Sequence, residues 1–206
     1  MIDRYNIDPN KVKVITNFVD TELFSPEPAP DTLITDRIFF LGRLTYAKNL
    51  EALITAAAET GWGLELVGAG ELEKPLKQLA EELNADVNFV GKVPQVDLPE
   101  LMRKYRYFIL PSHYEGMPKA LLEAMACGMC CLGTDASGIR EVIKHNQNGI
   151  LIPGTGAEEI AKEFRKLHEY DAEQLGRVAR AFIMESHSME GLAVKEYGLL
   201  SMLVSI

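Results

Sequence analysis

Short runs of apolar residues alternate along this chain with longer segments in which apolar positions recur every three or four residues. The runs indicate buried strands, and the recurring positions indicate amphipathic helices. Strands are predicted at 38–41, 64–67, 87–90, 107–110, 130–132 and 150–152, and helices at 50–59, 72–83, 98–104, 119–126 and 158–167. Short apolar strands that alternate with helices are typical of a parallel sheet with helices on both faces. The predicted fold class is therefore α/β.

The two ends of the chain depart from this alternation. Residues 11–16 alternate polar and apolar and predict a further strand, and three prolines between positions 26 and 30 indicate an extended loop. Beyond Pro153 the pattern is helical to the end, and residues 192–203 carry an apolar set too large for one exposed helix. We expect three parts: an N-terminal strand and connector (1–30), the α/β domain (31–170) and C-terminal helices (171–206).

Composition excludes several classes of protein. The chain has 206 residues and a formal net charge of −9, which argues against nucleic acid or an anionic membrane as the main partner. No apolar run approaches the roughly 18 residues of a membrane span, and the first five residues carry charge where a signal peptide would be apolar. The three cysteines (Cys127, Cys130 and Cys131) form neither a disulfide framework nor a four-ligand zinc site, and we expect them to be buried. A cytoplasmic location follows as an expectation.

Ligands of parallel α/β sheets bind beyond the carboxyl ends of the strands, which directs attention to the loops there. After the first strand of the domain, Gly42 allows close backbone approach, and Arg43 and Lys48 bring two cations to one loop. Such a pair can stabilise a departing diphosphate. The alternative is two solvated cations without a role.

The loop after the fourth strand carries two carboxylates. Glu115 lies in the loop and Glu123 in the helix that follows, and Gly116 between them would allow backbone geometries that a side chain forbids. Pro118 suits the first turn of that helix, whose unpaired N–H groups favour an anion. The alternative is that Glu115 caps the helix and Glu123 faces water.

These residues carry a family resemblance. Glu115 and Glu123 resemble the E-x7-E element of retaining glycosyltransferases with the GT-B fold, family 4 in particular, and so do the surrounding Pro111-Ser112 and residues 122–128. The connector at 17–26 resembles the one that joins the two Rossmann-like domains of that fold. The resemblance covers about residues 11–200. It implies a Rossmann-like C-terminal half of a GT-B fold with a helical extension, whose last helix would pack on an N-terminal domain.

The resemblance also implies roles for residues. Arg43 and Lys48 would stabilise the leaving diphosphate, Glu115 would address the hydroxyls of the donor sugar, and Glu123 would bind the ribose diol. The catalytic residues would be Glu115, Arg43 and Lys48. The implied donor-binding set is Gly42, Arg43, Lys48, Gly68, Lys92, Val93, Glu115, Gly116, Met117, Lys119, Ala120 and Glu123. No metal and no other cofactor is expected.

The expected activity is transfer of a sugar from a nucleotide-sugar donor to an acceptor with retention of configuration. A glycan, a lipid-linked sugar and a small alcohol all stay open as acceptors. The N-terminal domain, in the same protein or a partner chain, would complete the enzyme, so the isolated chain should turn over poorly. Peripheral attachment to the inner face of a membrane through that domain stays open. A non-catalytic nucleotide-sugar-binding subunit is the main alternative. An NAD-dependent oxidoreductase is disfavoured because Glu73 occupies the third glycine position after Gly68 and Gly70, and an acid–base hydrolase is weaker still.

Overall fold

The centre of the molecule is one parallel sheet of six strands. The computed structural model describes residues 8, 12 and 15–204. The strand order is β3-β2-β1-β4-β5-β6, and all neighbouring strands are parallel. The strands are β1 (Ile34–Leu41), β2 (Gly63–Val67), β3 (Val87–Gly91), β4 (Tyr105–Leu110), β5 (Cys130–Thr134) and β6 (Ile150–Ile152). Because the order reverses between β1 and β4, the loops after these two strands meet at the switch point where such sheets bind ligands.

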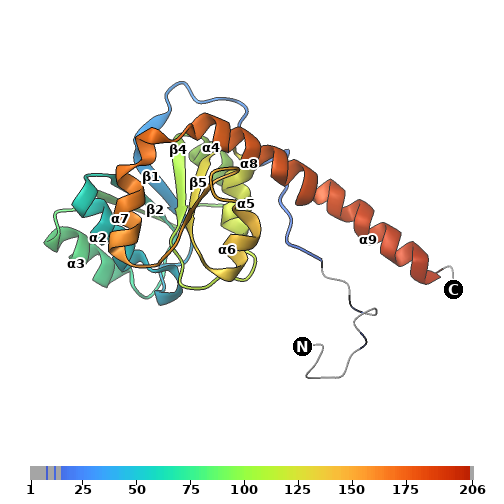
Figure 1. The fold of residues 1–206 in the computed structure, drawn as a ribbon, viewed down its shortest axis with the longest axis horizontal. Coiled ribbons are helices and arrows are strands. Elements are labelled where there is room, and N and C mark those ends of the chain that lie inside the picture. Colours follow the sequence, from blue (N-terminus) through green and yellow to red (C-terminus); the bar gives the residue numbers. More distant parts are fainter. Residues whose placement is uncertain (1–7, 9–11, 13–14, 205–206) are drawn as a thin grey trace.

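Helices cover both faces of the sheet, as the sequence predicts (Figure 1). One side carries α2, α3 and α7, and the other carries α4, α5, α6 and α8. The bounds are α2 (Leu50–Thr60), α3 (Glu73–Glu82), α4 (Leu98–Arg103), α5 (Lys119–Ala126), α6 (Ser137–Val142), α7 (Ala157–Arg165), α8 (Ala172–Ser186) and α9 (Met189–Val204). This arrangement confirms the α/β, Rossmann-like fold class.

Two element predictions need correction. Half of the strand predicted at 11–16 lies outside the described residues, and Val12, Ile15 and Thr16, which are described, belong to no strand. The six-residue helix α6 has no counterpart among the predicted helices. It is too short for a helical period to stand out, and its second residue is Gly138, a poor helix former.

The connector at the N-terminus is tied to the domain by a backbone bridge and by the side chain of Arg180. Val19 forms an isolated parallel bridge with Ser188, between α8 and α9. The guanidinium of Arg180 on α8 donates hydrogen bonds to the carbonyls of Thr21 and Phe24 and also to that of Ala126 at the end of α5. The connector, α5 and α8 are therefore held together by one side chain.

Helix α8 packs against α5 and β5, whereas α9 projects away from the body of the molecule (Figure 1). Val194, Tyr197 and Leu200 on α9 are 73%, 75% and 61% exposed. The predicted apolar set is thus largely on the surface here, and its packing on a further domain stays a prediction. In the described part of the chain, no helix combines the length and apolar character that crossing a membrane requires.

The core lies on both faces of the central strands, where the aromatic side chains of Phe39, Phe40 and Phe108 are fully buried. The chain's one tryptophan, Trp62, comes immediately before β2 and is also buried. Its indole Nε1 donates to the carbonyl of Phe164 on α7 at 3.1 Å, and its ring stacks on His168 with the centroids 5.2 Å apart. Trp62 therefore fixes α7 against the amino-terminal edge of the sheet.

Candidate functional site

The candidate site is formed where the loops after β1 and β4 meet. The amide of His113 donates to the carbonyl of Ala47 at 3.0 Å, and the buried side chain of Asn49 donates to the carbonyl of Pro111 at 3.0 Å. These bonds hold the two loops side by side although they are more than 60 residues apart in sequence. The residues predicted from each loop can therefore act on one ligand.

Lys48 and Glu115 form an ion pair at this junction, through Nζ and Oε1. Their side chains are only 18% and 12% exposed, so solvent screens the pair less than it screens a surface pair. The hydroxyl of Ser112, which is fully buried, also donates to Oε1 of Glu115 at 2.7 Å. The carbonyl of Ser112 accepts a hydrogen bond of 2.6 Å from the buried hydroxyl of Thr134 on β5. A polar chain from β5 thus fixes the Glu115 carboxylate beside Lys48.

Arg43 lies on the same loop but outside this network. Its side chain is exposed and forms no ion pair or hydrogen bond with other residues of the described chain. Of the three predicted catalytic residues, the structure therefore brings together Lys48 and Glu115 and leaves the side chain of Arg43 exposed to solvent.

Glu123 is buried on α5, with 4% of the residue exposed. The amide of Gln95 donates to its Oε1 at 2.9 Å, and the ammonium of Lys119 lies 3.8 Å from the same oxygen. Burial raises the pKa of the Glu123 carboxyl, opposed by Gln95 and Lys119, which favour the ionised form. The alternative that this side chain faces water is wrong.

The start of α5 is open to an anion. Pro118 is the N-cap residue, and no side chain caps the helix, so the alternative that Glu115 does so is wrong. The amides of Lys119 and Ala120 donate to no acceptor among the described residues. The neighbouring carbonyl of Met117 accepts a hydrogen bond of 2.8 Å from the side chain of Asn17 in the connector. Two residues of the predicted donor-binding set, Lys119 and Ala120, therefore have backbone amides available to an anion.

Glycines allow the site loops to approach one another. A Cβ on Gly68 would lie 1.9 Å from the carbonyl oxygen of Gly42, and one on Gly70 would lie 2.2 Å from that of Leu44. The G-x-G sequence at 68–70 is therefore explained by close packing between the loops after β1 and β2. Its glycines do not require a bound pyrophosphate.

The prediction that Gly116 has a backbone geometry forbidden to a side chain is wrong, whereas its place in the donor-binding set stays a prediction. Gly116 does not have a positive φ, and a Cβ placed there would meet nothing within 4 Å. The crowded glycine is Gly138 on α6, where a Cβ would lie 1.5 Å from the carbonyl oxygen of Gly116. The steric constraint therefore falls on Gly138 and not on Gly116. The sequence did not show this, because the loop after β4 and helix α6 meet only in the folded structure.

The loop after β3 brings in the remaining predicted residues. Lys92 is exposed, and the half-buried Val93 packs against the core. Gln95 on this loop was not predicted as a site residue, and neither were Ser112 and Asn17. Ser112 lies three residues before Glu115, a spacing short enough for the sequence to indicate the hydrogen bond between their side chains. The contacts of Gln95 and Asn17 cross 28 and 100 residues and leave no local pattern.

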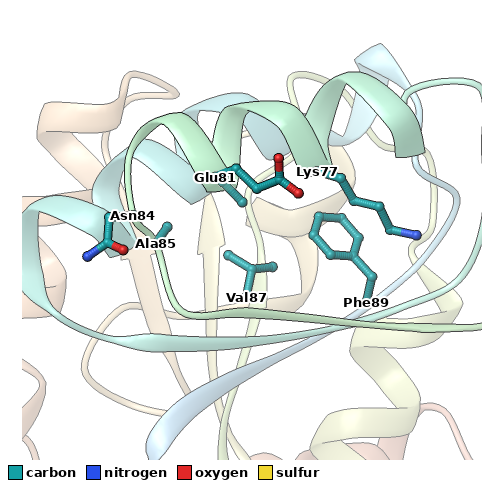
Figure 2. A pocket seen from close by; sticks show the side chains of 7 residues that line it. Lys77, Glu81, Asn84, Ala85, Val87 and Phe89 are labelled. Carbon is teal, nitrogen blue, oxygen red and sulfur yellow. The ribbon is translucent and has the colours of Figure 1, made fainter.

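A separate hollow lies beneath α3 at the outer edge of the sheet, lined by Lys77, Ala80, Glu81, Asn84, Ala85, Val87 and Phe89 (Figure 2). The Lys77 ammonium sits 5.4 Å from the centroid of the Phe89 ring. None of the predicted site residues lines this hollow. It is a feature of the β3 edge and is separate from the candidate site.

The remaining observations concern the buried cysteines and groups of residues that could bind a metal ion. All three thiols are buried, as expected, and burial raises the pKa of Cys127 and Cys130 to about 12. Among the described residues, no group of three His, Cys, Asp or Glu side chains is arranged to hold a metal ion. The charges available to a ligand here are therefore those of the lysines, the arginine and the two glutamates.

Known proteins resemble this chain in sequence. The profile of the family described as "Glycosyl transferases group 1" matches residues 33–182. Alpha-maltose-1-phosphate synthase of Mycolicibacterium smegmatis is 30% identical over 168 residues, which are 71% of this chain and 43% of that protein. The chain spans between 37% and 51% of the length of the curated relatives compared, or about half.

Solved structures show the same fold. Sucrose-phosphate synthase from Thermosynechococcus elongatus superposes with a TM-score of 0.85 at 23% identity, covering 99% of this chain and 55% of that one. Anabaena HepE in complex with UDP and glucose gives a TM-score of 0.84 at 22% identity, covering 97% and 59%. Because the family profile matches well over half of the chain, we conclude that this protein belongs to the family of glycosyl transferases group 1.

Proposed function

We propose that this chain is the donor-binding half of a retaining glycosyltransferase. It binds a nucleotide sugar at the edge of the sheet where the loops after β1, β3 and β4 meet. The observation that carries the proposal is the convergence there of the Lys48–Glu115 ion pair, the buried Glu123 and the unpaired amides at the start of α5. The solved HepE structure that shares this fold contains UDP and glucose, which supports the ligand class.

Each charged group has a part in this proposal. The ammonium of Lys48 has three N–H donors. One of them donates to Glu115, and the others donate to the diphosphate of the bound nucleotide. Arg43, which has no partner among the described residues, adds a second cation as negative charge develops on the departing diphosphate. Glu115 accepts hydrogen bonds from the hydroxyls of the donor sugar, and Glu123 accepts them from the ribose. These cations take the place that a divalent metal would otherwise fill.

The proposed reaction breaks the bond between the anomeric carbon and the diphosphate oxygen. The acceptor hydroxyl forms its new bond on the same face, and its proton passes to the leaving diphosphate, so configuration is retained. We do not assign Glu123 as a nucleophile of the glycosidase type, because that carboxylate is held by Gln95 and Lys119 and is committed to ribose. The acceptor site is supplied by the part of the enzyme that the chain does not span.

The test is calorimetric titration of the chain with UDP, GDP, ADP and NAD. We expect saturable binding of one nucleoside diphosphate and at least tenfold weaker binding in Lys48→Ala, about 1.4 kcal/mol. Lys74→Ala is the matched control, because Lys74 is an exposed lysine on α3 without an ion pair to a described residue. Binding of NAD alone, or equal affinities in both lysine variants, would refute the proposal. So would a folded chain that binds no nucleotide.

A further inference from the structure

The two oxygens of the Glu123 carboxylate have different surroundings. Both neighbours that favour the charged form, the Gln95 amide at 2.9 Å and the Lys119 ammonium at 3.8 Å, approach Oε1. Oε2 accepts no hydrogen bond from any residue in the described part of the chain. The carboxylate is therefore held on one side and open on the other.

The open oxygen is not sealed inside the protein. Among the described residues, no fully buried side-chain oxygen or nitrogen lacks a hydrogen-bond partner. Since Oε2 lacks one, it must belong to the 5% of the Glu123 side chain that stays accessible. A carboxylate that is nineteen-twentieths buried and keeps one unpartnered oxygen at the surface is arranged to accept a hydrogen bond from a ligand.

We propose that Gln95 is a positioning residue for ribose recognition, whose amide holds Oε1 of Glu123 so that Oε2 is presented to a hydroxyl of the bound nucleotide. This inference rests on the proposed function of the site. Gln95 acts through Glu123 and need not touch the ligand. Its chemistry fits the task, because a neutral amide donor fixes the carboxylate without neutralising its charge, which a closer cation would do.

Gln95 is not needed to hold its own loop. The loop is anchored on one side by Val93, which packs against the core, and on the other by Leu98, which is 6% exposed at the start of α4. Gln95 is itself exposed and reaches across to α5 through its side chain alone. Removing the amide therefore changes the carboxylate and leaves the loop in place.

The first test compares each ribonucleoside diphosphate with its 2′,3′-dideoxy form, which lacks both ribose hydroxyls, using UDP, GDP and ADP, in the wild-type chain and in Gln95→Met. Met has a side chain of similar length without an N–H donor. We expect the variant to bind the preferred ribonucleotide about fivefold more weakly and the dideoxynucleotide with unchanged affinity. Val96→Ala is the control, because Val96 is the next residue of the loop and is 72% exposed. Equal losses for both nucleotides, or no loss for either, would overturn the inference while the proposed function stands.

The second test needs no nucleotide. The titratable neighbours of Glu123 are Lys119 on its own helix and the Cys127 thiol one turn away, while Arg180 of α8 reaches the backbone at the far end of α5. Gln95→Met leaves all three in place. NMR titration of the Glu123 carboxyl should show a higher pKa in the variant, because a hydrogen bond that favours the ionised form is lost. An unchanged pKa would refute the positioning role even in a chain that binds nucleotides. Wild-type protein that binds no nucleotide would instead refute the proposed function and the inference with it.

Discussion

Gly138→Ala is the substitution whose effect follows most directly from the structure. The added Cβ would lie 1.5 Å from the carbonyl oxygen of Gly116 and 2.9 Å from that of Glu115, whereas ordinary contacts begin at 3.4 Å. Both obstacles are backbone atoms, so no side chain can rotate away. The start of α6 and the loop that carries Glu115 must separate by about 2 Å, the difference between 3.4 and 1.5 Å.

The expected cost combines three contributions. Forcing an extra carbon into a packed contact costs about 1–3 kcal/mol. Separation also breaks the hydrogen bond of 3.2 Å from the Gly138 amide to the Glu115 carbonyl, worth about 1 kcal/mol. Alanine is a better helix former than glycine by about 1 kcal/mol and offsets part of this loss. The free energy of unfolding should therefore fall by about 1–3 kcal/mol.

Urea unfolding followed by circular dichroism measures this change. With a slope of about 2 kcal/mol/M, we expect the midpoint of Gly138→Ala to fall by about 0.5–1.5 M and the slope to stay unchanged. Gly116→Ala is the matched control on the other side of the same contact. A Cβ there meets nothing within 4 Å, and φ is not positive, so its midpoint should stay the same or rise slightly. Equal midpoints for the two variants would refute the steric reasoning.

Three further outcomes are expected. In calorimetry, Glu115→Gln should leave the affinity for free nucleoside diphosphate unchanged and lower the affinity for the intact nucleotide sugar. Equal losses of affinity for both ligands would contradict the role of Glu115 in sugar binding. The raised pKa of Glu123 means that the folded chain keeps this proton to higher pH than the unfolded chain, so this group's contribution to stability falls as pH rises from the unfolded to the folded pKa. In Glu123→Gln this decrease in stability with rising pH should be absent. Urea midpoints that change equally between acid and neutral pH in the variant and the wild type would contradict the prediction. A thiol reagent at pH 8 should leave the native cysteines unmodified and react after unfolding, whereas rapid native labelling would disagree with their burial and raised pKa values.

The sequence predicted the fold well, and it predicted the two loops whose residues Lys48 and Glu115 meet, for identifiable reasons. Five of the helices and all six strands of the domain follow from apolar runs and helical periods, which report burial directly. The strands β1 and β4 begin earlier than predicted, at Ile34 and Tyr105, because polar residues interrupt the apolar run at their amino-terminal ends. Convergence of Lys48 and Glu115 followed from the general rule that ligand loops gather at the carboxyl edge of a parallel sheet.

What the sequence did not predict depends on contacts between distant segments. Gln95 and Glu123 are joined across 28 residues, and Gly138 and Gly116 meet only because α6 folds back on the loop after β4. No local pattern carries such pairs. The exposure of Arg43 belongs to the same class, because two cations on one loop give no sign of which will find an acidic partner.

The position of Trp62 determines what an optical experiment on this protein reports. It is the only tryptophan, and it lies before β2, at the opposite edge of the sheet from Lys48, Glu115 and Glu123. Its ring is enclosed by Tyr107, Phe164 and His168. Tryptophan fluorescence, excited selectively, therefore follows the release of α7 from the sheet during unfolding and is insensitive to direct contact with a ligand. A fluorescence change during a nucleotide titration would thus measure a rearrangement transmitted through the whole domain.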